Sequence, residues 1–210
     1  MTDLAHDLAS LMCSKLCHDL VSPIGALGNG VEVLADETDA ELREGALDLI
    51  AQSARAAAAK LQFARLAYGS AGGAGGTIDL ASAARAAQEY FGTTKASLEW
   101  EPGAQAVPKD AARLCLNLLL VALDCIPRGG EIRAVLDLSP EGHGSFVAEA
   151  TGRGARIAEP TWAAISGKTP SEELDARLVQ PFFTGHLARQ IGAEVTQQAD
   201  EASVRLTARL

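Results

Sequence analysis

Hydrophobic residues recur along residues 16–34 at spacings of four, four, three, four and three. Their average spacing is close to the period of about 3.5 residues found in helices that pack side by side, which predicts an amphipathic helix. Its apolar stripe consists of Leu16, Leu20, Ile24, Leu27, Val31 and Leu34. The pattern breaks at 36–39, where Thr38 and Glu41 have the spacing of a capping box that begins a second helix. The second stripe consists of Leu47, Ile50, Ala54, Ala57, Leu61, Ala64 and Tyr68.

The second half of the chain mixes helix-like and strand-like segments. We expect helices at 79–91, 108–126, 159–165 and 171–191, and strands at 97–100, 131–138, 145–150, 194–198 and 203–208. These elements predict one mixed sheet covered by helices, so the fold class is α+β with a C-terminal α/β sandwich. Residues 69–76 contain only Gly, Ser and Ala, which predicts a flexible linker. The expected domains are a helical hairpin over 1–68 and an α/β domain over 77–210.

The predicted hairpin needs a partner. Two antiparallel helices alone leave much of their apolar surface in water. A second copy of the chain can bury that surface by two-fold symmetry, so we expect a homodimer in which two hairpins form a four-helix bundle. Residues 54–59 are small at nearly every position and would let helices approach closely.

The charge of the chain excludes several partners. Its formal net charge is −9, from 18 Lys and Arg against 27 Asp and Glu, and such a surface repels nucleic acid and anionic membranes. No apolar run approaches the roughly 20 residues of a membrane span, and the N-terminus has no signal-peptide pattern, so we expect a cytoplasmic protein. The cysteines lie in apolar helical runs and are expected to be small buried residues in a reducing compartment. They are Cys13, Cys17, Cys115 and Cys125.

The candidate chemistry lies in residues 18–23, His-Asp-Leu-Val-Ser-Pro. His18 is two residues from Leu20, or about 200° around a helix, so we expect it to be exposed on the side away from the stripe. Neutral imidazole is a nucleophile near physiological pH. Asp19 is expected to hold the proton of one ring nitrogen while the other nitrogen attacks phosphorus.

The residues after His18 favour a docking surface. Pro23 removes a backbone hydrogen bond and is expected to bend the helix just after the histidine. Ser22, Gly25 and Asn29 follow on the same face as His18 and form a strip of small side chains. We expect another protein to dock on this strip.

Two other interpretations compete for these residues. His6 and Asp7 form a second His-Asp pair, but no proline follows it and it lies near a terminus that can fray, so His18 is favoured. Cys13 and Cys17 are one helical turn apart beside His18, which raises the option of a metal site. The imidazole is turned about 100° from Cys17 around the helix, and no second pair of ligands completes a tetrahedron, so we expect no bound metal.

Three motifs carry a family resemblance. They are residues 16–23 (Leu-Cys-His-Asp-Leu-Val-Ser-Pro), residues 61–69 (Leu-Gln-Phe-Ala-Arg-Leu-Ala-Tyr-Gly) and residues 116–122 (Leu-Asn-Leu-Leu-Leu-Val-Ala), the last running into Gly129-Gly130. With them the chain resembles the core of a sensor histidine kinase, and more closely the ChpT-type histidine phosphotransferases of alphaproteobacteria. The resemblance implies a dimerisation and phosphotransfer hairpin followed by a degenerate ATP-binding domain that helps to hold a receiver domain.

Departures from the kinase pattern argue against ATP binding. Val121 stands where the kinases have an asparagine that holds magnesium, and Ala150 stands where they have an aspartate that recognises adenine. Residues 182–189 contain a single glycine where a glycine-rich stretch would wrap the triphosphate. Gly152 and Gly154 then predict an ordinary turn. We expect the chain to have no cofactor of its own.

The resemblance and the departures together predict a histidine phosphotransferase. His18 would take a phosphoryl group from the receiver domain of a hybrid histidine kinase and pass it to the aspartates of response regulators, with Mg²⁺ held by the receiver. Ser22 stands where related kinases keep a residue used in phosphatase chemistry, so dephosphorylation of the regulator stays open. The alternatives are a divergent ATP-dependent sensor histidine kinase core and a non-catalytic dimeric adaptor, which would tolerate replacement of His18.

Overall fold

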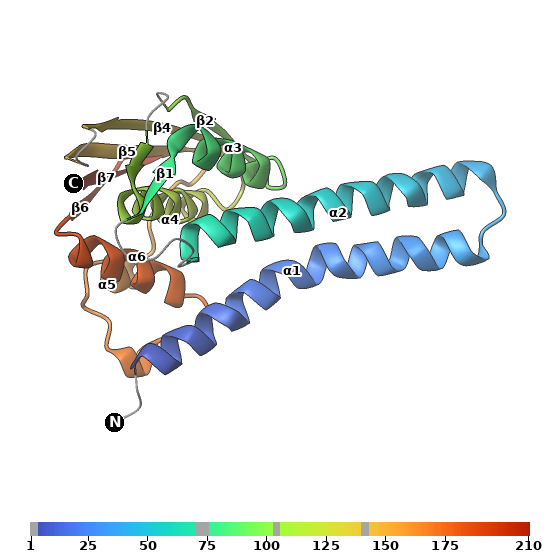
Figure 1. Ribbon diagram of the computed structural model, residues 1–210, viewed down its shortest axis with the longest axis horizontal. Helices are drawn as coiled ribbons and strands as arrows, with labels where there is room; N and C mark the ends of the chain where they lie inside the picture. Colours follow the sequence, from blue (N-terminus) through green and yellow to red (C-terminus); the bar gives the residue numbers. More distant parts are fainter. Residues whose placement is uncertain (1–3, 70–75, 103–105, 140–142) are drawn as a thin grey trace.

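The computed structural model describes residues 4–69, 76–102, 106–139 and 143–210. A long helical hairpin, α1 (Leu4–Asp36) and α2 (Ala40–Tyr68), projects from an α/β portion formed by the later residues (Figure 1). The predicted α+β class, with a hairpin followed by an α/β sandwich, is confirmed. Residues 70–75 of the predicted linker lie outside the described residues.

The two helices of the hairpin pack closely around small residues. Gly30 of α1 is buried, and a Cβ at this position would come within 2.7 Å of Ile50 Cγ1 on α2. Pro23 is also buried, and α1 changes direction part-way along its length (Figure 1). Ile50 therefore packs inside the hairpin, whereas Ile24 and Val31 of the first predicted stripe remain largely exposed.

The start of α2 differs from the prediction by one residue. Asp39 is the N-cap, and its carboxylate accepts hydrogen bonds from the N–H groups of Glu41 and Leu42 at 2.9 and 3.1 Å. The capping box predicted at Thr38 is wrong. The carboxylate of Glu37 accepts instead from the N–H groups of Thr38 and Asp39, so acidic side chains before and at the cap organise this turn.

A five-stranded sheet forms one layer of the α/β portion, with strand order β2-β4-β5-β7-β6. The β2–β4 pair is parallel and the other three pairs are antiparallel. The elements are β1 (Thr77–Asp79), α3 (Leu80–Phe91), β2 (Ala96–Trp100), β3 (Ala106–Pro108), α4 (Lys109–Cys125), β4 (Gly130–Leu138), β5 (Gly144–Thr151), α5 (Glu159–Ile165), the 3₁₀ turn η1 (Ser171–Glu173), α6 (Val179–Gln190), β6 (Glu194–Ala199) and β7 (Ser203–Arg209).

Two expectations for this portion are wrong in detail. A second sheet exists, because β1 pairs antiparallel with β3, and each of these strands is too short to show a period of two in sequence. The helix predicted over 171–191 is interrupted, and α6 begins only at Val179. The carboxylate of Asp175 accepts from the N–H groups of Arg177 and Leu178, which forms a turn in place of the helix.

The core lies between the five-stranded sheet and its helices. Alternate residues of β4, β5 and β7 point inward and are buried, and α4 contacts both β5 and β7. The buried side chains of these strands include Ile132, Ala134, Phe146, Ala148, Val204 and Leu206. The other face of the sheet carries ion pairs such as Arg133–Glu99 at 2.9 Å, so the sheet is covered by helices on one side.

The C-terminal end of α2 is anchored in this core. Phe63 is buried against Tyr90 of α3, with ring centroids 4.6 Å apart. Asn117 of α4 donates a hydrogen bond to the Ala67 carbonyl at 3.0 Å, and Arg113 donates to the Tyr68 carbonyl at 3.2 Å. These bonds satisfy carbonyls at the end of α2 and hold the hairpin against the α/β portion.

Candidate functional site

His18 lies on the exposed side of α1. Its side chain is 89% exposed, as the helical periodicity predicts. The distance from His18 Nδ1 to Asp19 Oδ1 is 3.6 Å, which is longer than a hydrogen bond. A small rotation of either side chain would bring the two atoms within hydrogen-bond distance. Catalytic hydrogen bonds are often long in enzymes without substrate and shorten when it binds.

Asp19 is held from two helices. Its carboxylate forms an ion pair with Lys15, one turn earlier on α1, with Nζ and Oδ2 3.2 Å apart. Its backbone carbonyl accepts a hydrogen bond at 2.9 Å from Lys60 Nζ on α2. The sequence reasoning missed both lysines, although Lys15 has the i, i+4 spacing of a helical ion pair.

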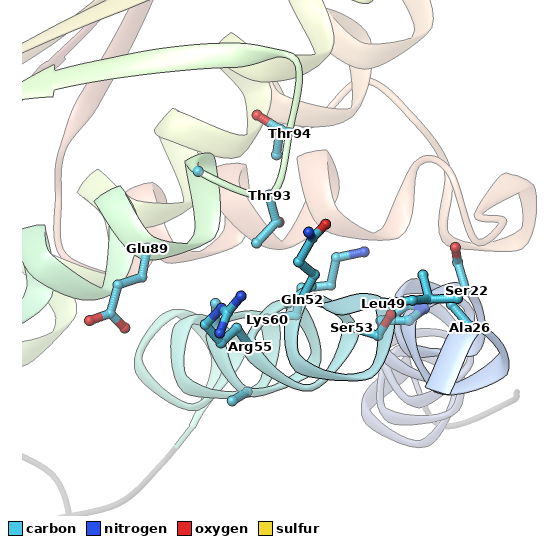
Figure 2. Close-up of a pocket in the computed structure, with 15 residues that line it drawn as sticks. Ser22, Ala26, Leu49, Gln52, Ser53, Arg55, Lys60, Glu89, Thr93 and Thr94 are labelled. Atoms are coloured by element: carbon cyan, nitrogen blue, oxygen red, sulfur yellow. The ribbon is translucent and has the colours of Figure 1, made fainter. Parts of the chain in front are cut away.

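An open groove begins beside the predicted docking strip. It has a volume of about 920 Å³ and runs from α1 across α2 to the loop that follows α3. Figure 2 shows Ser22 at one end and Thr93 and Thr94 above α2, with Gln52 pointing toward Thr93. The groove therefore spans the junction between the hairpin and the α/β portion, and its α1 end lies close to the helical turn that carries His18.

The strip itself is only partly continuous with the groove. Ser22, Gly25 and Asn29 are all exposed on α1, but of these three only Ser22 lines the groove. A Cβ built at Gly25 would meet no atom within 4 Å. The surface of α1 at Gly25, below His18, is therefore open.

A smaller cavity of about 50 Å³ lies under Asp19 and is lined by residues of α1, α2, α3, α4 and α6. Burial raises the pKa of Tyr68 and of Tyr90 well above the ordinary value, and the negative charge of Asp19 acts in the same direction. Both phenols therefore stay neutral at physiological pH. Gln180 also lines this cavity, and its Oε1 is buried with no hydrogen-bond partner.

The positions at which the sequence departs from the kinase pattern lie in packed elements. Val121 and Ala150 are fully buried in α4 and β5. Residues 182–189 lie within α6, so their backbone N–H groups are not free to wrap phosphates. Gly185 has a packing role, because a Cβ there would collide with the Ile165 carbonyl at the end of α5. Gly154 lies in a turn with φ +72°, as predicted.

The expectation that all four cysteines are buried is wrong for two of them. Cys115 and Cys125 are buried, but Cys13 and Cys17 are exposed on α1. Burial raises the pKa of Cys125 to about 12. The exposed pair lies on a side of α1 that α2 does not cover, which periodicity alone does not reveal. Among the described residues there is no cluster of three or more His, Cys, Asp or Glu side chains able to hold a metal.

Comparisons with known proteins identify the family. Residues 80–203 match the family model described as the histidine phosphotransferase C-terminal domain. The chain is also 41% identical over 204 residues to "Protein phosphotransferase ChpT" of Brucella abortus (strain 2308), a match that covers 97% of this chain and 96% of that protein. The chain belongs to the histidine phosphotransferase family.

Solved structures agree with this assignment. A bacterial phosphotransferase superposes with a TM-score of 0.88 at 39% identity, covering 100% of this chain and 98% of that chain. The histidine kinase AdeS of Acinetobacter baumannii gives a lower TM-score of 0.43 at 10% identity, over 92% of this chain and 96% of that chain. This histidine phosphotransferase acts in a phosphorelay, and its partners are proteins of two-component signalling. In the part of the chain that the structure describes, no helix is long and apolar enough to span a membrane.

Proposed function

We propose that His18 is the phosphoacceptor of this histidine phosphotransferase. The observation that carries the proposal is the almost fully exposed imidazole of His18 beside a fixed aspartate. Lys15 holds the carboxylate of Asp19, and Lys60 holds its backbone carbonyl. A ring nitrogen of His18 attacks phosphorus, a P–N bond forms, and the P–O bond to the receiver aspartate breaks. Asp19 takes or holds the proton on the other nitrogen as positive charge develops on the ring.

The proposed donor and acceptors are receiver domains. The receiver of a hybrid histidine kinase brings its aspartyl phosphate to His18, and response regulators then take the phosphoryl group onto their own aspartates. Mg²⁺ comes with each receiver, and the chain has no cofactor of its own. The chemistry needs an in-line approach and neutralised charge more than covalent machinery, so positioned side chains and a docking face suffice.

The groove beside Ser22 is the proposed docking site. It joins two surfaces that a receiver can touch together, the strip on α1 and the loop after α3 (Figure 2). Ser22 is exposed where the strip meets the groove, which supports a contact between Ser22 and the active site of a bound regulator. Phosphatase chemistry at Ser22 is part of this proposal and rests on the resemblance to kinases.

We place this exchange in the cytoplasm, where receiver domains act. The two copies of the chain form a homodimer through their hairpins, and neither nucleic acid nor membrane is a partner. Support comes from the net charge of −9 and from large aliphatic side chains exposed along the hairpin.

The direct test is incubation of the chain with a phosphorylated receiver domain. Phosphate that is stable to base and labile to acid should appear on the chain and then move to a second receiver. Stable binding of receivers with no phosphate on the chain would instead show the non-catalytic adaptor.

A variant of the strip tests the docking site. Gly25→Trp should raise the KM for a phosphorylated receiver by about tenfold or more, because a large side chain then occupies the open surface below His18. The unfolding midpoint should not fall, since no atom lies within 4 Å of the new Cβ. Steady-state transfer kinetics give the measurement. Gly45→Trp is the matched control, because Gly45 is equally open but lies in α2 near the hairpin turn. Equal KM values for the two variants would contradict docking on the strip.

Nucleotide is expected to have no effect on this chain. Mg-ATP at millimolar concentration should neither raise the melting temperature nor phosphorylate His18, because Val121 and Ala150 cannot replace the polar side chains that kinases use. The measurement is sensitive, since a ligand at about 100 times its Kd adds roughly 2.7 kcal/mol to the free energy of unfolding. A saturable shift together with label that disappears in His18→Gln would establish the divergent kinase instead.

A further inference from the structure

Pro23 leaves one carbonyl of α1 without its helical donor. In an α-helix the carbonyl of residue i accepts from the N–H of residue i+4, and proline has no N–H. The missing bond is therefore the one to the carbonyl of Asp19, the residue that follows His18. Backbone carbonyls in packed regions need a partner, so a donor from another element is required here.

Lys60 of α2 supplies that donor. Its Nζ lies 2.9 Å from the Asp19 carbonyl oxygen, in a partly buried position between the two helices. A charged ammonium makes a stronger hydrogen bond than the peptide N–H that it replaces. Lys15 holds the carboxylate of the same residue, so the backbone and the side chain of Asp19 are both fixed.

We propose that Lys60 is a positioning residue for phosphoryl transfer. Its side chain gives the Asp19 carbonyl a hydrogen-bond donor in place of the one that Pro23 lacks. The inference rests on the proposed function, in which His18 accepts the phosphoryl group. The bond ties the bent turn of α1 to α2, and this turn carries the imidazole. His18 is thereby presented to the aspartyl phosphate in one orientation, and a loosened turn would spend less time in line for transfer.

The test uses four variants of the full chain with a phosphorylated receiver domain. Lys60→Met removes the donor and keeps the apolar stem, and Lys60→Arg keeps a charged donor. Pro23→Ala returns a backbone N–H at position 23, so the Asp19 carbonyl regains a helical partner without Lys60. The fourth variant combines Pro23→Ala with Lys60→Met.

We expect Lys60→Met to lower the rate at saturating receiver about tenfold, with the KM unchanged within about twofold. Lys60→Arg should recover most of this rate. In the Pro23→Ala background, Lys60→Met should lower this rate by no more than about twofold, because the Asp19 carbonyl then accepts from the backbone N–H of residue 23. An equal cost in both backgrounds overturns the proposal. A raised KM with an unchanged rate also overturns it, since Lys60 lines the groove and would then be a docking residue.

A spectroscopic readout separates this proposal from the assignment of His18. The ¹³C resonance of the Asp19 carbonyl should move in Lys60→Met and return toward the wild-type position in the double variant. The carbonyl of Asp48, within α2, is the control and should not move. An unchanged Asp19 resonance overturns the role of Lys60 while leaving the function intact. A wild-type chain that accepts no phosphate overturns both proposals.

Discussion

Replacing His18 with glutamine should abolish phosphate acceptance from a phosphorylated receiver. Glutamine has an amide in place of the nucleophilic ring nitrogen, and the loss of an attacking group that forms a covalent intermediate costs several orders of magnitude in rate. The fold should not change, because the side chain is 89% exposed. Transfer of labelled phosphate, followed on denaturing gels, measures the effect.

His6→Gln is the matched control for this prediction. His6 is also exposed on α1 and is also followed by an aspartate, so the two variants differ only in the site that each removes. His6→Gln should leave transfer unchanged. Loss of transfer in the His6 variant with normal transfer in the His18 variant would move the phosphoacceptor to His6.

Leu47→Asp should convert the proposed dimer into monomers. Leu47 is 56% exposed on α2, and burial of each large aliphatic side chain against a second hairpin contributes roughly 1.5–3 kcal/mol. A carboxylate at this position would be desolvated without a partner, which reverses the sign of the contribution. Light scattering coupled to size-exclusion chromatography at micromolar concentration measures the mass. Helical content should stay the same in circular dichroism.

Leu47 tests the dimer more cleanly than Ile50, the next apolar residue of the same stripe. Ile50 contacts the buried Gly30 position within the hairpin, so Ile50→Asp would also destabilise the monomer. Val135→Asp is the control, because Val135 is 57% exposed on the outer face of β4. It should leave the mass unchanged. A stable wild-type monomer would contradict the four-helix bundle.

Local sequence patterns were enough to predict most of the elements. The heptad-like spacing predicted both helices of the hairpin, because apolar residues that share one face of a helix recur with that period. The same period predicted that His18 is exposed. The strands of the five-stranded sheet were predicted within a few residues, because alternation and turn residues are local signals.

Shorter or competing signals were not enough. Asp39 rather than Thr38 caps α2, because neighbouring polar residues can each cap and the choice depends on the path of the chain. The break before α6 depends on the Asp175 turn, which competes with an otherwise helical pattern.

The family resemblance and the departures from the kinase pattern at Val121 and Ala150 could be recognised from sequence alone. They were sufficient to identify the histidine phosphotransferase family to which the chain belongs. The environment of the site depended on tertiary structure. Lys60 is 41 residues from Asp19, and the groove joins α1 to the loop after α3. The exposure of Cys13 and Cys17 likewise follows from which side of α1 faces α2. Periodicity shows which residues share one face of a helix, whereas the partner that covers that face depends on contacts between residues far apart in the chain.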